Sequence, residues 1–247
     1  ESATHQVNAR NVIEAIPYLS ELIVRLRDAE EEAAWKVLDY AMFHLGLAYL
    51  ESERYDRAIQ GFQAYTDRFP EGVYVKGAHL LWAEAYAAQG KWPDVVRIMG
   101  VFLRDPLLKT RERVWGNLLV GEAWFRQEQC ERAVEPLAFV FQNAGVRIVR
   151  KEAAVQMSTA LIRLERWRDL FPVIHYVYRT SARYDIALNL SLVEAGDRSY
   201  ETEKSLYAMS RYRLVFFKHE LIENLTANMA AAERDRKLVW QEKGLDR

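Results

Sequence analysis

Cysteine is nearly missing from this chain, since Cys130 is the single one among 247 residues. One cysteine excludes an internal disulfide, and a lone cysteine at an apolar repeat position is typical of small core filler rather than of a nucleophile. No stretch approaches the ~18 uninterrupted apolar residues of a membrane-spanning helix, so we expect no integral membrane segment. The chain also lacks a large excess of positive or negative charge. The net charge is −1, which favours neither nucleic acid nor an anionic membrane as a partner.

The usual sequence signatures of catalysis are also missing. The chain has no glycine-rich phosphate loop, no GxSxG elbow, no paired CxxC and no dinucleotide-binding glycine pattern. The closest approach to a metal motif begins at His219, but Glu223 stands where a zinc protease helix needs its second histidine. We interpret that segment as the charged face of a helix. The basic cluster Lys109, Arg111 and Arg113 fits ordinary solvated residues at a helix end. The sequence therefore predicts no enzyme, no cofactor and no metal site.

What the chain does have is a repeat. Half of its residues are hydrophobic and 28% are charged, which excludes disorder by composition. Four segments carry the same order of side chains at a period of 37 or 38 residues: a small residue, a large one three positions later, an apolar one near a turn, and two apolar positions on a second helix. The small residues are Gly46, Ala83, Gly121 and Ser158, and the large ones are Tyr49, Tyr86, Trp124 and Leu161. The turn residues are Tyr55, Trp92, Cys130 and Trp167, and the second helices carry Ala58 and Phe62, Val95 and Met99, Ala133 and Leu137, and Leu170 and Ile174.

This order of side chains predicts pairs of antiparallel helices. Two helices joined by a short turn cannot bury their apolar stripes alone, so successive pairs must stack. Small residues let the backbones approach, and the large ones fill the gaps between pairs. The punctuation agrees: Gly90 and Pro93 mark a helix end and the next helix start, while Pro70 and Pro106 fall where second helices should stop.

The segment 39–72 resembles a tetratricopeptide repeat at nearly every signature position. The residues that carry the resemblance are Leu45, Gly46, Tyr49, Tyr55, Ala58, Phe62 and Pro70. Tyr65 departs from the pattern, because the family usually has a small residue there. The wording of residues 62–92, FxxYxxRFPEGxYVxxAxxLxAEAYxxxGKW, is also similar to that of bacterial envelope repeat proteins.

The resemblance implies an all-α fold, a right-handed α-α superhelix in one helical-repeat domain over 1–247. Its expected parts are a half-repeat helix with its lead-in at 8–38, tetratricopeptide-like repeats at 39–72, 76–109, 114–147 and 151–182, a divergent fifth repeat at 183–216, and a C-terminal capping helix at 217–247. We expect the partner of the first helix to lie upstream, and the fifth pair to turn at Gly196 and Asp197. The last segment could instead begin a coiled coil.

Function in such a solenoid lies on the concave surface, lined by the first helix of each pair. Counting from the small residues gives the exposed inner positions, with Tyr40 and Trp115 one turn further on the same faces. The predicted partner-binding residues are Tyr40, Phe43, Leu47, Leu80, Glu84, Trp115, Leu118, Glu122 and Phe125. The fourth repeat would contribute Val155, Thr159 and Ile162. Chaperone-binding members of the family clamp a carboxylate with lysine, arginine and asparagine on this inner face. The corresponding positions here are the apolar Phe43 and Leu47, so that function is not expected.

An apolar, weakly acidic groove suits a partner helix or peptide with a basic residue. The sequence thus predicts a non-enzymatic interaction scaffold with a protein or peptide partner, no nucleic acid, and a place in a larger cell-envelope assembly. The alternative is a structural or oligomerisation module, such as a homo-oligomer, whose groove is self-filled and whose C-terminal helix starts a coiled coil. The chain begins at Glu1 rather than methionine, as a processed or excised polypeptide does. Together with the envelope-like wording this favours the periplasm or cell envelope over the alternative, the cytoplasm.

Overall fold

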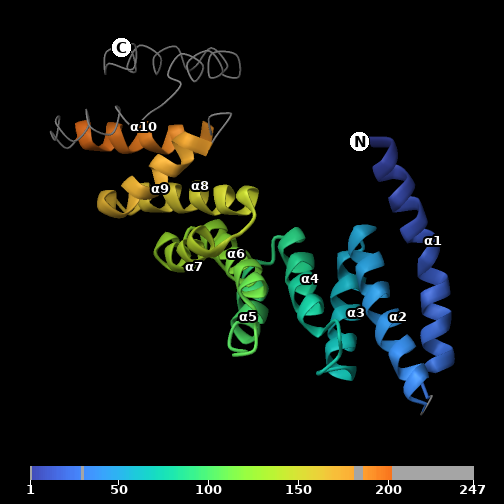
Figure 1. Cartoon of the computed structure of the whole chain (residues 1–247). Helices are drawn as coiled ribbons and strands as arrows, with labels where there is room; N and C mark the ends of the chain where they lie inside the picture. The colour runs from blue at the N-terminus through green and yellow to red at the C-terminus, as the bar shows by residue number, and fades with distance from the viewer. Residues whose placement is uncertain (1, 29–30, 181–185, 202–247) are drawn as a thin grey trace. The chain divides into compact units, whose positions relative to one another are not determined.

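Every regular element of the described residues is an α-helix (Figure 1). The structure is a computed structural model, and it describes residues 2–28, 31–180 and 186–201. The helices are α1 (Ser2–Leu26), α2 (Glu32–Glu51), α3 (Tyr55–Arg68), α4 (Val75–Ala88), α5 (Trp92–Phe102), α6 (Thr110–Arg126), α7 (Cys130–Asn143), α8 (Arg147–Arg163), α9 (Trp167–Thr180) and α10 (Ile186–Glu201). The expected all-α, solenoid-like class is confirmed.

The chain divides into two compact units, residues 1–128 and 129–247, whereas the sequence predicts one domain over 1–247. In the first unit each helix packs on the next, from α1 to α6, and α4 also contacts α2 and α6. In the second unit α8 packs against α7, α9 and α10. The division falls between α6 and α7, so the two helices in the predicted repeat 114–147 belong to different units.

Helix α1 precedes α2 and packs along it, just as α3 precedes α4 and packs along it (Figure 1). Both α2 and α4 are the first helices of their pairs. Helix α1 therefore occupies the place of the second helix of a pair. Its side chains Ile23 and Leu26 join the core that α2, α3 and α4 share. That core is built around the fully buried Phe62 and Tyr65 of α3. A second core follows between α4, α5 and α6, where Val95 and Met99 are fully buried.

The turns within the four pairs repeat in register at the backbone level. Each turn contains one residue with positive φ. These residues are Glu53, Gly90, Glu128 and Glu165, at intervals of 37, 38 and 37 residues. In three pairs the next amide donates to the carbonyl five residues earlier, as from Arg54 N to Tyr49 O at 2.8 Å. This is the left-handed cap that closes a helix before a turn, and glycine adopts it without strain. Three of the four turns use glutamate instead.

Replacing Glu53 with glycine should therefore raise the free energy of unfolding by about 0.5–1 kcal/mol, because the strain of a left-handed glutamate outweighs the entropy that glycine adds to the unfolded chain. Urea unfolding followed by circular dichroism measures the change. The matched control is Glu135→Gly, at an exposed site inside α7. This change should lower the free energy of unfolding by about 0.5–1 kcal/mol, because glycine is unfavourable inside a helix. Equal losses in both variants would contradict the capping argument.

In the second unit α10 corrects one expectation. The predicted turn at Gly196 and Asp197 is wrong, because α10 runs on through both residues to Glu201. One glycine costs a helix only about 1 kcal/mol, and packing offsets that cost. Here Ala195 is buried, and α10 packs on α8. The remainder of the predicted fifth repeat and the predicted capping or coiled-coil helix at 217–247 lie outside the described residues.

Candidate partner-binding site

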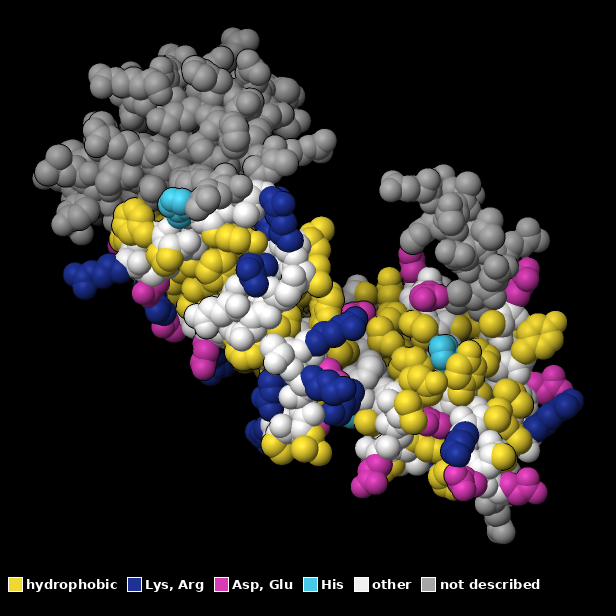
Figure 2. Space-filling model, viewed as in Figure 1, with side chains coloured by type: hydrophobic (Ala, Val, Ile, Leu, Met, Phe, Trp, Pro, Cys, Tyr) yellow, Lys and Arg dark blue, Asp and Glu magenta, His cyan; other side chains and the backbone are white. Residues whose placement is uncertain are grey.

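The first unit holds a pocket between the first helices of two successive pairs, α4 and α6. Its volume is ≈ 440 Å³. Its lining comes from both helices: Lys76, Gly77, Leu80, Leu81 and Glu84 of α4, and Arg111, Glu112 and Trp115 of α6. On the face of this unit in Figure 2, hydrophobic side chains gather into a broad patch with a histidine among them.

The wall of the pocket on α4 follows helical spacing. Gly77, Leu80, Leu81 and Glu84 lie three or four residues apart and so share one face of the helix. Leu80 and Leu81 are half-buried, because each also packs against a core of the first unit. Gly77 has no side chain to fill the space, and a Cβ built on it would only touch the ring of Phe43 at 3.6 Å. Glycine at position 77 thus leaves this part of the pocket wall without a side chain beside Phe43.

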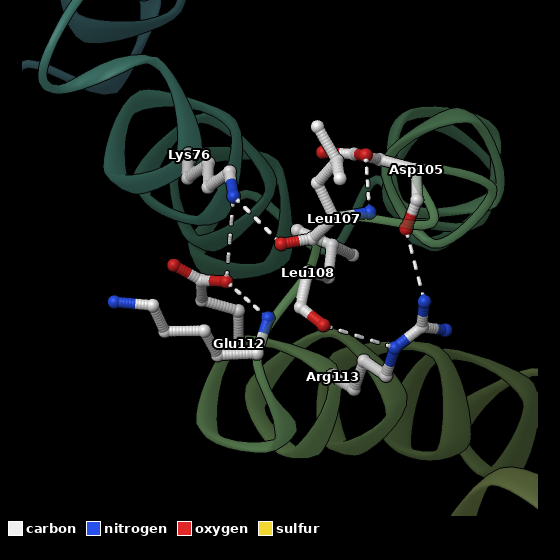
Figure 3. Close-up of polar contacts among 7 residues, drawn as sticks. Lys76, Asp105, Leu107, Leu108, Glu112 and Arg113 are labelled. Carbon is white, nitrogen blue, oxygen red and sulfur yellow. Dashed lines mark hydrogen bonds and ion pairs between the residues drawn. The ribbon is translucent and has the colours of Figure 1, made fainter.

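One end of the pocket is held by a polar network between the α5–α6 loop and both helices (Figure 3). Lys76 Nζ donates to Leu107 O at 3.1 Å and lies 3.7 Å from Glu112 Oε2. Glu112 also accepts from Lys109 N at 2.6 Å, which caps the start of α6. Arg113 donates to Asp105 O at 3.0 Å and to Leu108 O at 3.3 Å. These contacts fix the first turn of α6, and with it Arg111 and Trp115, against α4.

Two charged residues of the pocket have no partner among the described residues. Glu84 and Arg111 are exposed, and neither makes a hydrogen bond or an ion pair with the part of the chain that the structure describes. Glu84 still touches solvent, yet the atoms around it displace part of its hydration, and this desolvation raises its pKa. The pocket thus combines an apolar wall with one open carboxylate and one open guanidinium.

An aromatic cluster on α2 adjoins this pocket through Gly77. The ring of Phe43 stacks on Tyr74 with centroids 4.7 Å apart, and Tyr40 packs on His44 at 4.0 Å. Burial lowers the pKa of His44, which opposes its protonation. Tyr40 stays 49% exposed, so the cluster offers an aromatic surface beside the pocket.

The structure brings three of the predicted partner-binding residues into the pocket: Leu80, Glu84 and Trp115. Phe43 and Leu118 are buried at 9% and 7% exposure by contacts within the chain, so they support the groove instead of facing a partner. Leu47 and Phe125 are half-buried, and Tyr40 lies exposed on the aromatic cluster. Glu122 is half-buried and pairs with Arg126 at 3.3 Å. Binding through these residues stays a prediction.

In the second unit the predicted inner positions are covered. Ile162 is fully buried and Thr159 is 5% exposed, while Val155 is half-buried. The reason is that α10 packs on α8, so residues counted as an open face of α8 belong to a core. The prediction that Thr159 and Ile162 lie on an exposed inner face is therefore wrong.

The prediction missed Leu81, which stands next to the predicted Leu80. It also missed two pairs of residues, Lys76 and Gly77 on α4 and Arg111 and Glu112 on α6. The first two stand seven and six residues before Ala83, further along α4 than the counting reached. The other two were placed before the repeat, but α6 begins at Thr110 and carries them on its first turn. The sequence signal for this start was weak, because Lys109 is not one of the usual capping residues and only Glu112, three positions later, fits a helix start there.

Neither a metal cluster nor a membrane span is found in the described part of the chain. No group of three metal-ligating side chains comes together there. Among those residues no helix is long and apolar enough to cross a bilayer. The pocket also brings no cysteine, serine or histidine next to its carboxylates. What the site offers is shape, apolar surface and two open charges.

Stacked helical hairpins define the class of α-helical repeat proteins, and here two first helices, α4 and α6, form a pocket. Residues 40–72 match the family model described as tetratricopeptide repeat. They cover most of α2, all of α3 and the first part of the loop after it. This match identifies one tetratricopeptide repeat within the chain. No curated protein sequence matches the chain. The predicted resemblance to bacterial envelope proteins stays a prediction.

Proposed function

We propose that this protein is a non-enzymatic interaction module that binds a short segment of a partner protein in the pocket between α4 and α6. The observation that carries the proposal is the pocket itself, with Leu80, Leu81 and Trp115 on its walls. Its volume of ≈ 440 Å³ falls inside the range of about 300–1,000 Å³ that binding pockets usually have. An apolar side chain of the partner would occupy it and anchor the segment.

Two further points favour a protein partner. Tetratricopeptide repeats generally mediate protein–protein interaction. The aromatic cluster beside the pocket extends the apolar surface across α2, and exposed apolar area of this kind marks interaction sites on soluble proteins. A segment anchored in the pocket could therefore continue over Tyr40.

Filling the pocket from inside tests the proposal. Gly77→Leu places an apolar side chain in the space that the partner's anchor would occupy. Peptides selected from a random displayed library on the wild-type protein should bind the Gly77→Leu variant at least about 10-fold more weakly, since losing one buried apolar anchor costs about 1.5–3 kcal/mol. Fluorescence anisotropy with labelled peptides measures the affinity.

The chain offers two controls for this experiment. Gly77→Ala adds only a Cβ at ordinary contact distance from Phe43, so it should keep the fold and most of the affinity. Val101→Asp changes an apolar residue of α5 that is 62% exposed and does not line the pocket, and it should leave binding unchanged. Selected peptides that bind Gly77→Leu as tightly as the wild type would exclude this pocket as the binding site.

We also propose that the partner belongs to a bacterial cell-envelope assembly. The support is the wording of residues 62–92, which is similar to that of envelope repeat proteins.

A further inference from the structure

We propose that the pocket between α4 and α6 recognises charge as well as shape. It binds an extended segment in which an acidic and a basic side chain flank the apolar anchor. The acidic side chain would contact Arg111 and the basic one Glu84. This inference rests on the proposed binding function and names the chemistry of the partner. The juxtaposition behind it is an apolar wall between two open charges of opposite sign.

The four charged residues of the pocket divide into a pair and two singles. Lys76 and Glu112 lie 3.7 Å apart and are both half-buried, so each offsets the other's charge. Glu84 and Arg111 have no such partner in the part of the chain that the structure describes. An unpaired carboxylate and an unpaired guanidinium in one pocket leave no net charge but a strong polarity. A partner with the opposite polarity would satisfy both.

The two open charges belong to different ends of the pocket. Arg111 is next to Glu112, which contacts Lys76 at the start of α4. Glu84 is eight residues further along α4, and at 1.5 Å per residue this corresponds to about 12 Å. Leu80 lies midway between Lys76 and Glu84 on the same helix. The order along the pocket is therefore cation, apolar wall, anion.

An extended segment matches that separation. Side chains on one face of an extended chain recur every second residue, so an acid, an anchor and a base at i, i+2 and i+4 span about 13 Å. A helix rises only 1.5 Å per residue and needs about nine residues to cover about 12 Å, whereas an extended segment needs about five. We therefore assign the site to an extended acid-x-apolar-x-base sequence or its reverse.

The surroundings of Glu84 strengthen its preference for a cation. Its carboxylate has lost part of its hydration to the pocket walls, which raises its pKa. A lysine or arginine of the partner would replace that hydration with a charge-assisted hydrogen bond. Arg111 can hold a carboxylate through two parallel hydrogen bonds, as guanidinium groups do.

A charge swap tests the inference. The double variant Glu84→Arg/Arg111→Glu exchanges the two ends and leaves Leu80, Leu81 and Trp115 in place. Both changes suit their helices, since glutamate is favourable in the first turn of α6 and arginine near the end of α4. Circular dichroism melting verifies the fold. If the double variant unfolds, Glu84→Gln and Arg111→Gln replace it as single neutral probes.

The expected result is a reversal of peptide polarity. Peptides selected on the wild type should carry the acid and the base two residues to either side of an apolar anchor, and lose about 10-fold or more in affinity on the swapped variant. Peptides with the two charges exchanged should regain it. For the neutral probes, the loss should be about 3–10-fold each and should shrink at high salt, because screened charges contribute less.

Two outcomes would overturn the inference, and they differ in meaning. Selected peptides that lose binding on Gly77→Leu yet carry no charges, or space them for a helix, or bind the swapped variant equally well, would refute the charge reading and leave the pocket's function standing. Peptides that bind regardless of Gly77→Leu would refute the pocket itself, and the charge reading with it.

Discussion

Gly46→Ala should lower the free energy of unfolding by up to about 2 kcal/mol, although alanine is the better helix former. A Cβ at this position would lie 2.7 Å from Phe62 Cε1 and 2.9 Å from Cδ1. Phe62 is fully buried, so its ring cannot move aside without disturbing the core of the first unit. Overpacking of this kind costs about 1–3 kcal/mol, and the gain in helix propensity of about 1 kcal/mol offsets only part of it.

The same substitution elsewhere gives the matched control. Gly100 lies near the end of α5, is exposed, and would have nothing within 4 Å of an added Cβ. Gly100→Ala should therefore raise stability by about 0.5 kcal/mol. Urea unfolding of both variants, read by circular dichroism, compares the signs. A third variant, Gly46→Ala/Phe62→Leu, should lose less than the sum of its single changes, because the smaller side chain admits the added methyl. Additive losses, or a gain for Gly46→Ala, would contradict close packing at this position.

The periodic small residues made the fold predictable from the sequence. Gly46 and Phe62 belong to two of the repeated series, and the structure brings them into contact across α2 and α3. The reason is that solenoid packing is local: each helix packs only on helices of its own pair and of the adjacent pairs, so a period in the sequence becomes a period in space. The left-handed turn residues keep the same 37, 38 and 37 spacing, although glutamate at three of them gave no sign of it.

The site was less accessible to prediction. Leu80, Glu84 and Trp115 could be found by counting, because a groove face recurs with the helix period. Phe43 could not be judged, since its burial depends on Tyr74, which comes from the α3–α4 loop and stacks on it. The covered face of α8 depends on α10, an element from the next pair. Residue exposure is set by neighbours from other segments, and a repeat pattern does not specify them.

The pocket also depends on a departure from regularity. Position 77 on its α4 wall is glycine, although the helix pattern alone would allow an apolar side chain there. Likewise, Arg111 reaches the pocket only because α6 starts at Thr110, where Glu112 caps it and pairs with Lys76. The shape of this pocket is therefore set by residues that break the repeat. Tyr65 breaks the repeat too, and its role is in the core.

Tyr65 stands where tetratricopeptide repeats usually have a small residue, and the structure shows what it does. Its hydroxyl donates to Asp39 Oδ1 at 2.6 Å and accepts from Tyr74 N at 3.1 Å. Asp39 Oδ2 also accepts from Val73 N at 3.3 Å. The phenol is fully buried and ties α2 and α3 to the loop that leads into α4. Gly72 leaves room for it, because a Cβ there would lie 2.6 Å from the hydroxyl.

Tyr65→Phe should lower the free energy of unfolding by about 1–3 kcal/mol, because it keeps the ring but leaves the buried Asp39 oxygen and the Tyr74 amide without this partner. Tyr40→Phe is the matched control: Tyr40 is 49% exposed and should change stability by less than about 0.5 kcal/mol. Urea unfolding at pH 7 measures both. An equally small change at position 65 would show that the hydroxyl network does not stabilise the fold.

The same variant predicts a difference in alkaline stability. Burial, together with the hydrogen bond to Asp39, raises the pKa of Tyr65 above its ordinary value of 10.0. A group whose pKa is raised by folding contributes stability below its unfolded pKa and loses it as the pH rises toward the folded one. The wild type should therefore lose stability above about pH 10 more steeply than Tyr65→Phe, so that the two unfolding curves converge. The other 12 of the 13 tyrosines titrate in both proteins and cancel in this difference. If the free energies of unfolding of the two proteins stay equally far apart from pH 8 to pH 11, the neutral phenol of Tyr65 does not stabilise the packing of α2, α3 and the loop.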